Sequence, residues 1–409
     1  MLTPRLAVLL LTCGLAAATV SAQRPPRARD LGVPFEGAPG RDNAITDVAG
    51  VTVGHSTIIR GDGALKVGEG PVRTGVTAVL PRGRDSMQKP SFAGWFSQNG
   101  NGEMTGTTWI EESGFLEGPV MITNTHSVGA VRDAVIKWRI RSGPPDASGY
   151  WWSLPVVAET YDGVLNDING FHVKDEHAFA ALDGATSGPV AEGNVGGGTG
   201  MALFGFKGGI GTGSRVVELD ATHRYTVGVL VQGNFGRRPQ LLVDGVPVGR
   251  EITDLMPEGR RDTSPALGAP LETPPSPPAQ PEKEGSIIVV IATDAPLSDR
   301  QLMRLCRRGM LGIGRVGGIA GQTSGDLLLA FSNAPDVLVP RRPVVPLLTT
   351  PRLADTWIDP FFEATIEATA EAILNAMVAA ETLVGRDGNT LHALPHDRLR
   401  EVMGRYGRG

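Results

Sequence analysis

The feature that most constrains this chain is an abrupt border at Gly285-Ser286, where a proline-rich run meets an apolar strand. Residues 256–285 include the run Pro274–Pro281 and show neither helical nor strand periodicity, so they cannot bury enough surface to order themselves. Directly behind Ser286, residues 287–292 are all apolar. The sequence therefore predicts a strand that begins at a potential cleavage point.

The Gly285-Ser286 pair has the chemistry that self-cleavage requires. Glycine places no side chain in the way of an attack, and a released Ser286 would be a nucleophile that carries its own base, the new α-amine. The reference pKa of an α-amine, about 7.7–8.0, leaves part of it neutral near pH 7. Judged locally, an ordinary linker that ends in Gly-Ser is the simpler interpretation, so the rest of the chain has to decide.

Composition describes a large mixed chain without a nucleic-acid footprint. The chain has 409 residues, of which 41% are hydrophobic and 20% charged, so it can build a sizeable core. Its net charge is −5 and Lys and Arg are not clustered, which argues against a nucleic-acid partner. Glycine is abundant, at 55 residues, and not periodic, which indicates tight turns and loops that approach a ligand closely.

The first 22 residues have the pattern of a secretory leader. Arg5 precedes an apolar run from Leu6 to Val20, and Val20-Ser21-Ala22 fits a small-residue cleavage site. The apolar run is too short for a convincing membrane span. We therefore expect an exported protein, periplasmic or secreted, that has no membrane association after the leader is removed. Its one remaining cysteine, Cys306, is expected to be buried.

Strand and helix patterns alternate along the rest of the chain, after an Arg/Pro-rich segment over 23–40 that is predicted to be extended. The most apolar strands lack alternation, as expected of strands buried on both faces. This favours one layered α/β domain built from residues 41–285 and 286–409. Strands are predicted at 75–80, 120–125, 227–232, 286–293 and 327–331, a strand pair at 46–55, and helices over 126–140, near 176–182, from Ser298 onward and over 360–384.

Eight short motifs, spread over residues 40–385, share one order with a known family. They are 45–55, 155–163, 166–170, 196–200, 207–211, 231–236, 285–290 and 324–326. In these motifs the chain resembles the L-aminopeptidase/D-amidase-esterase family, which includes the β-peptidyl aminopeptidases. The resemblance implies an α-β-β-α sandwich, similar to that of the self-processing aminopeptidases and ornithine acetyltransferases. It also implies cleavage between Gly285 and Ser286, and a homo-oligomer of the resulting α–β heterodimers.

The resemblance assigns catalytic roles to five residues. Ser286 would be the nucleophile, Ser324 would hydrogen-bond it or its amine, and Asp326 would orient that network. Some members of the family carry Glu where this chain has the shorter Asp326. Asn234 would donate to the oxyanion, and Tyr161 would help to hold the tetrahedral intermediate. Without the family context, Ser-Gly-Asp and Gly-Asn-Phe-Gly would each be read as a turn.

Two further residues are assigned to substrate binding by the same resemblance. Glu159 would bind the free amino group of the substrate, and Trp152 would form an apolar wall for its first side chain. A solvated charge and a core Trp are the alternatives.

Neither a metal site nor a phosphate loop is predicted, and no cofactor is expected. His172 and His177 are five residues apart, whereas a metalloprotease helix spaces its histidines by four. The glycine-rich segment Gly196–Gly200 lacks the Lys and the spacing of a P-loop, so we interpret it as close backbone packing around the active site.

Three functions remain open at this point. The first is an exported, self-processing serine aminopeptidase that removes N-terminal residues from short peptides, aminoacyl amides or esters. The second is an acyl transferase of the same superfamily, against which Ser286 argues because those enzymes are expected to use Thr. The third is a secreted binding protein whose Gly-Ser border is never cut. The preference for L-, D- or β-amino-acid substrates is left open.

Overall fold

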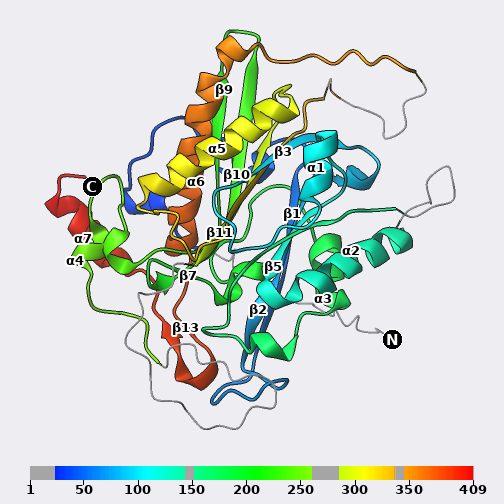
Figure 1. Cartoon of the computed structure of the whole chain (residues 1–409). Helices are drawn as coiled ribbons and strands as arrows, with labels where there is room; N and C mark the ends of the chain where they lie inside the picture. Colours follow the sequence, from blue (N-terminus) through cyan, green and yellow to red (C-terminus); the bar gives the residue numbers. More distant parts are fainter. Residues whose placement is uncertain (1–23, 143–151, 260–284, 336, 338–344, 409) are drawn as a thin grey trace, which may run out of the picture.

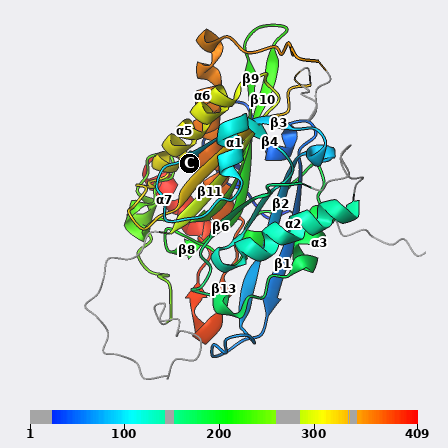
Figure 2. The same cartoon turned by 45° about the vertical axis from the view of Figure 1, so that its right-hand side comes forward.

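Two β-sheets stack face to face, and each is covered on its outer side by helices (Figure 1). A computed structural model of the chain describes residues 24–142, 152–259, 285–335, 337 and 345–408. From one side to the other, the layers are two helices, a four-stranded sheet, a six-stranded sheet and two more helices (Figure 2). The predicted α-β-β-α sandwich is therefore confirmed.

The four-stranded sheet has the order β1-β2-β5-β6, in which β5 and β6 run parallel and the other neighbours antiparallel. Apolar side chains of β2, β5 and β6 pack against the two helices on the outer face, α2 and α3. The bounds are β1 Thr52–Arg60, β2 Val72–Arg84, β5 Val120–Asn124, β6 Val156–Thr160, α2 Val128–Ser142 and α3 Asp175–Asp183.

The six-stranded sheet has the order β4-β3-β12-β11-β10-β9, with β11 and β12 parallel at its centre. Helices α5 and α6 cover its outer face. The bounds are β3 Ser91–Ser97, β4 Phe115–Leu116, β9 Gly209–Glu218, β10 Arg224–Asn234, β11 Ser286–Thr293, β12 Asp326–Ser332, α5 Asp299–Arg315 and α6 Asp359–Val378.

Shorter elements fill the edges of the sandwich. A hairpin of β7 and β8 lies beside the end of β10, and a second hairpin of β13 and β14 precedes the C-terminal helix α7. The bounds are α1 Thr107–Ser113, β7 Ala202–Leu203, β8 Phe206–Lys207, α4 Val248–Glu251, β13 Leu383–Val384, β14 Thr390–Leu391 and α7 His396–Arg405.

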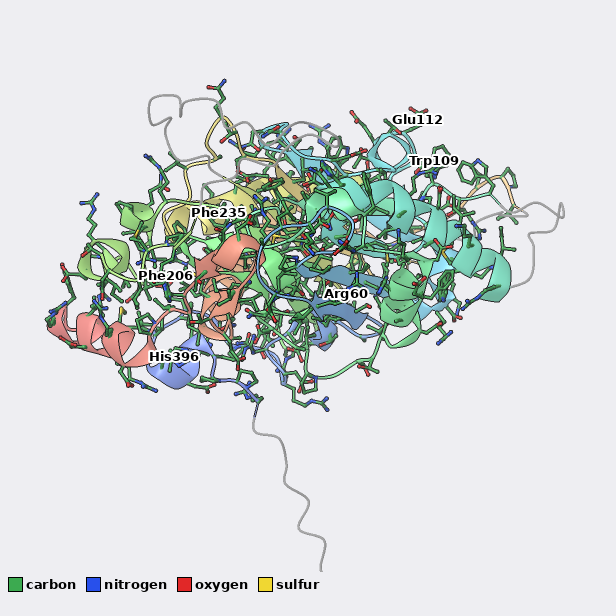
Figure 3. All side chains as sticks on the ribbon, turned by 90° about the horizontal axis from the view of Figure 1, so that it is seen from below. Arg60, Trp109, Glu112, Phe206, Phe235 and His396 are labelled. Atoms are coloured by element: carbon green, nitrogen blue, oxygen red, sulfur yellow. The ribbon has the colours of Figure 1, made fainter. Side chains whose placement is uncertain are left out.

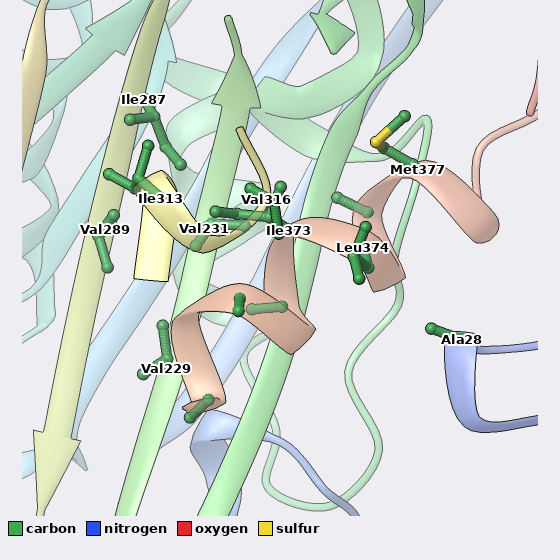
Figure 4. Close-up of a cluster of buried hydrophobic side chains, with 14 of the residues drawn as sticks. Ala28, Val229, Val231, Ile287, Val289, Ile313, Val316, Ile373, Leu374 and Met377 are labelled. Atoms are coloured by element: carbon green, nitrogen blue, oxygen red, sulfur yellow. The ribbon is translucent and has the colours of Figure 1, made fainter. Parts of the chain in front are cut away.

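The unbroken apolar run of β11 is explained by burial on both faces. Ile287, Val289 and Ile291 pack under α5 and α6, where Figure 4 shows the first two beside Ile313 and near Ile373. The alternating residues, Ile288, Val290 and Ala292, face the other sheet. Each side chain from Ile287 to Ala292 therefore contributes to one of two cores, which is why this run shows no polar position.

Helix α5 begins directly after Ser298, where a helix was predicted, and a capping box marks its start. The Ser298 hydroxyl accepts from the Gln301 N–H at 3.3 Å, and the Gln301 side chain accepts from the Ser298 N–H at 3.0 Å. This reciprocal pair satisfies two backbone donors at the start of the helix. Cys306 lies on the buried face of α5, as expected.

The predicted strand pair at 46–55 is wrong in its first half. Residues Ile45–Asp47 form a 3-10 turn, and β1 begins only at Thr52. The Asp47 carboxylate accepts from the backbone N–H groups of Asp42 and Ala44, at 2.9 and 3.0 Å. This local side-chain capping competes with strand pairing and holds the turn.

Two predicted ends also differ. The helix predicted over 360–384 stops at Val378. Beyond it, the Asn194 side chain accepts from the Glu381 N–H and donates to the Glu381 carbonyl, and these bonds replace the helical ones. The strand predicted at 227–232 runs from Arg224 to Asn234, which is its last residue.

The segment over 23–40 is not simply extended. Residues Ala28–Leu31 form a 3-10 turn, and Ala28 is buried against the main core. Arg27 forms an ion pair with Glu192 at 2.7 Å, and Arg29 forms one with Glu371, also at 2.7 Å. The arginines that gave this segment a polar appearance therefore anchor it to the sandwich.

Two predictions lie outside the described residues. The secretory leader falls on residues 1–22, and most of the proline-rich segment falls on 260–284. The beginning of that segment is described: Glu258 pairs with Thr390 as an isolated bridge, and its carboxylate lies 2.8 Å from His392. Residues 256–259 therefore belong to the folded part.

Candidate active site

The predicted nucleophile lies where the ends of three strands meet. Ser286 is the first residue of β11 and pairs with Asn234, the last residue of β10. On the other side, Ile287 pairs with Asp326, the first residue of β12. Ser286 is 5% exposed. Strand register thus brings together three residues that are far apart in the sequence.

The Gly285–Ser286 peptide bond is surrounded by polar groups. The Ser324 hydroxyl contacts the Gly285 carbonyl oxygen and lies 2.6 Å from the Asp326 carboxylate. A hydroxyl has one hydrogen, so Ser324 can donate to only one of these oxygens at a time. A side chain at position 285 would collide with the Asn234 carbonyl, so this close approach requires glycine.

Asp326 is buried and is held by Asn99, a residue that the sequence analysis missed. The Asn99 amide donates to Asp326 Oδ2 at 3.1 Å and accepts from the Asp326 N–H at 2.6 Å. Asn99 lies in the polar stretch after β3, whose last residue is Ser97. A run of Asn and Gly directly behind a buried strand is the signal that could have identified it.

The Asn234 side-chain amide has a fixed orientation. Its Oδ1 accepts from the Ala202 N–H at 2.8 Å, and its Nδ2 donates to the Tyr161 carbonyl at 2.9 Å. Because the oxygen faces a donor and the nitrogen an acceptor, a flipped amide would lose both bonds. A Cβ built on Gly285 would lie 2.9 Å from Nδ2, so this donor lies next to the residue whose carbonyl would need an oxyanion donor.

Tyr161 contributes its backbone as well as its side chain. Its carbonyl holds Asn234, while its hydroxyl folds back over Gly163, where any side chain would collide with it. The sequence prediction named Tyr161 as a residue that helps to hold the tetrahedral intermediate, and the contact of its carbonyl with Asn234 could not be read from a motif.

Glu159 is buried at the end of β6. One of its oxygens accepts from the Thr125 hydroxyl, and the other accepts from the Glu103 N–H at 3.0 Å. Burial is the main cause that raises the pKa of Glu159 above its ordinary value. A Cβ placed on Gly102 would lie 3.3 Å from the carboxylate and 3.0 Å from Gly325, so Glu159 is a near neighbour of the Ser324 segment.

Trp152 occupies a more exposed position. Its side chain is 44% exposed and its ring packs edge-on against Trp109, with 5.8 Å between centroids. Figure 3 shows Trp109, a residue of α1, at the periphery of the molecule. The role of Trp152 as an apolar wall stays a prediction.

The glycine-rich segment Gly196–Gly200 packs against strands of both sheets. The Gly197 N–H donates to the Thr77 hydroxyl at 3.1 Å, and a Cβ on Gly198 would lie 2.5 Å from the Ile210 nitrogen. The segment leads directly into Met201 and Ala202, the second of which holds Asn234. Its glycines let the backbone pass close enough to reach the site.

The two histidines considered as ligands have other partners. His172 lies between Asp167, at 2.8 Å, and Arg60, at 2.9 Å, and His177 bonds the Lys174 N–H at 3.0 Å. Within the described ranges, no group of three His, Cys, Asp or Glu side chains is arranged to hold a metal ion. No helix in the same ranges is long and apolar enough to cross a membrane.

Comparison with known proteins identifies relatives across nearly the whole chain. The model of peptidase family S58 matches residues 43–391. The β-peptidyl aminopeptidase BapA of Sphingosinicella microcystinivorans is 54% identical over 97% of this chain and 96% of its own. The enzyme of the same name from Sphingosinicella xenopeptidilytica is 47% identical over 92% of this chain and 91% of its own.

A solved structure extends the similarity to three dimensions. The L-aminopeptidase D-Ala-esterase/amidase of Ochrobactrum anthropi, described as a variant of the Ntn-hydrolase fold, superposes with a TM-score of 0.82 at 45% identity. The match covers 94% of this chain and 99% of that one. A family model across most of the sequence, relatives above 40% identity and a shared fold agree. The chain therefore belongs to peptidase family S58 and is an aminopeptidase.

Proposed function

We propose that the chain is an exported serine aminopeptidase that cuts itself between Gly285 and Ser286 and then uses Ser286 as an N-terminal nucleophile. The observation that carries this proposal is the arrangement around that bond: Ser324 contacts the Gly285 carbonyl, and Asn234 Nδ2 lies beside Gly285. A linker with no catalytic function would not require both the Ser324 hydroxyl and the Asn234 amide at the same peptide bond.

Self-cleavage would proceed through an ester. The Ser286 hydroxyl attacks the Gly285 carbonyl carbon, the C–N bond breaks, and the Ser286 nitrogen leaves as an amine that takes up the hydroxyl proton. The Ser324–Asp326 pair is the candidate carrier of that proton. Water then opens the ester, which frees the Gly285 carboxylate and restores the Ser286 hydroxyl.

Turnover would repeat the attack on a substrate carbonyl. The free α-amine of Ser286 would accept the hydroxyl proton, as its reference pKa of about 7.7–8.0 allows. The amide of Asn234 would donate to the developing oxyanion. When the scissile C–N bond breaks, the shortened peptide leaves as an amine that takes up this hydroxyl proton, and Ser286 is left acylated. Water then opens the ester, which gives the free N-terminal residue and restores the Ser286 hydroxyl.

The proposed cleavage is tested by a denaturing gel of the purified protein. We expect two bands, with Ser286 at the N-terminus of the smaller chain by terminal sequencing, and hydrolysis of chromogenic aminoacyl amides. One intact band from active protein would refute self-cleavage. Transfer of an acyl group to an added amine in place of water would favour the acyl transferase of the same superfamily.

Glu159 should make the enzyme strict for a free substrate amine. A buried carboxylate that faces an ammonium gains a charge-assisted bond, whereas facing an acetylated amine it keeps its desolvation cost and loses its partner. We therefore expect slow cleavage of N-acetylated substrates, and a smaller preference for free amines in Glu159→Gln, measured as the ratio of kcat/KM values.

The neighbouring Glu103 supplies a matched control. Its side chain is exposed, and its backbone N–H donates to Glu159. Its negative charge contributes to the raised pKa of Glu159, so Glu103→Gln would favour the ionised carboxylate and should retain the preference. Equal rates on free and acetylated substrates in the unaltered enzyme would contradict the aminopeptidase role of Glu159.

The proline-rich segment should be dispensable for processing. Shortening residues 260–283 while keeping Glu284-Gly285-Ser286 should still give two bands on a gel, because this composition cannot build a core. The deletion should spare Glu258, which is bonded to the β13–β14 hairpin. Loss of folded protein on this deletion would show that the segment packs against the sandwich.

Export and assembly complete the proposal. The leader-like residues 1–22 support export, which cell fractionation would test. We also propose that the mature protein is a homo-oligomer of α–β heterodimers, to be measured by size-exclusion chromatography with light scattering.

A further inference from the structure

Lys207 in β8 is a cation in an unusual environment. Its side chain is fully buried, and its ammonium donates to the carbonyls of Gly198, Met201 and Gly208 at 3.3, 2.9 and 2.7 Å. In the described part of the chain no carboxylate forms an ion pair with it, and burial lowers its pKa to about 7.

Such a residue is costly to keep for packing alone. Burying a charge without a counter-ion is unfavourable, and an apolar side chain of similar volume is often as stable or more stable in such a place. Three carbonyl partners satisfy the three ammonium hydrogens but do not neutralise the charge. The position of Lys207 therefore calls for an explanation beyond stability.

One of the three carbonyls connects Lys207 to the candidate site. The Met201 carbonyl and the Ala202 N–H belong to the same planar peptide, and that N–H donates to Asn234 Oδ1 at 2.8 Å. The Asn234 Nδ2, which lies beside Gly285, is at the far end of this hydrogen-bonded pair of amides. A positive charge therefore acts at one end and the proposed oxyanion donor lies at the other.

We propose that Lys207 is a positioning residue that orients and strengthens the Asn234 donor through the Met201–Ala202 peptide. A cation on the carbonyl polarises the peptide and makes its N–H a better donor, and the bond to Oδ1 polarises the Asn234 amide in turn. The inference rests on the oxyanion role proposed for Asn234.

The hairpin that carries this peptide has a second support. Arg238 donates to the Phe204 and Gly205 carbonyls at 3.0 and 2.8 Å, and the Phe204 and Phe235 rings meet edge-on at 5.1 Å. Figure 3 shows Phe206 and Phe235 in the same part of the molecule. The turn of the hairpin therefore stays anchored when the charge of Lys207 is removed.

The test is Lys207→Met in the full chain, which removes the charge and keeps the length. We expect kcat to fall about tenfold with KM unchanged, a fraction of the effect of deleting an oxyanion donor. In the Asn234→Ala background the same change should have no further effect, because its path would be gone. If a folded variant cuts itself too slowly to yield mature enzyme, the half-time of its self-cleavage is measured in place of kcat, and the same variants are compared.

Arg238→Met provides the matched control, since it removes a buried cation that bonds to the turn of the same hairpin but not to the Met201–Ala202 peptide. It should lower the melting temperature with kcat unchanged. If Lys207→Met does not fold, Lys207→Gln, which keeps a neutral donor, takes its place. Failure of both to fold would make Lys207 structural and overturn the inference.

The double variant separates this inference from the proposed function. If the reduction of kcat in the double variant equals the product of the reductions in Lys207→Met and Asn234→Ala, Lys207 acts independently of Asn234 and the inference is wrong. Normal kcat in Lys207→Met, with slow turnover in Asn234→Ala, would refute only the role of Lys207. Normal turnover in Asn234→Ala would refute the oxyanion assignment itself.

Discussion

Replacing Ser286 with alanine should leave the chain uncut and without aminopeptidase activity. One hydroxyl is asked to open the Gly285–Ser286 bond and then to attack substrate, so its removal abolishes both reactions. A denaturing gel should show a single full-length band, and a chromogenic aminoacyl amide should be released no faster than by buffer.

A second serine in the same part of the chain supplies the control. Ser298→Ala removes the cap of α5 and should cost about 1 kcal/mol of stability, but it should leave cleavage and turnover intact. If the Ser286→Ala chain still cuts itself at 285–286, another group performs the attack and the proposed mechanism is wrong.

Replacing Asn234 with alanine should preserve the fold and slow turnover by roughly 10²–10³, the usual effect of losing one oxyanion donor. The side chain ends in a bond to the Tyr161 carbonyl and faces Gly285, so the loss falls on the reacting carbonyl and not on the core. The measurement is kcat on protein whose processing has first been verified, because Asn234 could also assist self-cleavage.

Asn194→Ala is the comparable loss of an amide outside the site. Asn194 also bonds backbone groups, those of Glu381, but it lies at the end of α6. Its removal should affect stability more than kcat. A reduction below about threefold in Asn234→Ala would remove Asn234 from the oxyanion site.

The layered fold was predictable because its pattern is local. The unbroken apolar run behind Ser286 required a strand covered on both faces, and Ile287 and Ile288 do pack into different cores. The errors occurred where one side chain redirects the backbone. The Asp47 carboxylate holds a 3-10 turn in place of a strand, and Asn194 ends α6 from a distant loop.

The candidate site was predictable only in the residues that its motifs contain. Ser286, Asn234 and Asp326 meet through strand register, which follows once the strands are paired. The supporting contacts do not follow in this way. Asn99 and Asp326 are 227 positions apart, and neither segment contains a sequence signal that predicts contact with the other. The Thr125 contact to Glu159 is likewise a product of the folded chain.

The strand order of the larger sheet determines how the two products of the proposed cleavage would stay associated. β11 and β12, from the part after Ser286, lie between β3 and β10, from the part before it. The two products would therefore share one sheet and could separate only by unfolding. The precursor folds as a single molecule, whereas the cut enzyme, once denatured, would have to reassemble from two. Refolding yield should then depend on protein concentration after cleavage but not before it, so that maturation would be irreversible in practice as well as in chemistry.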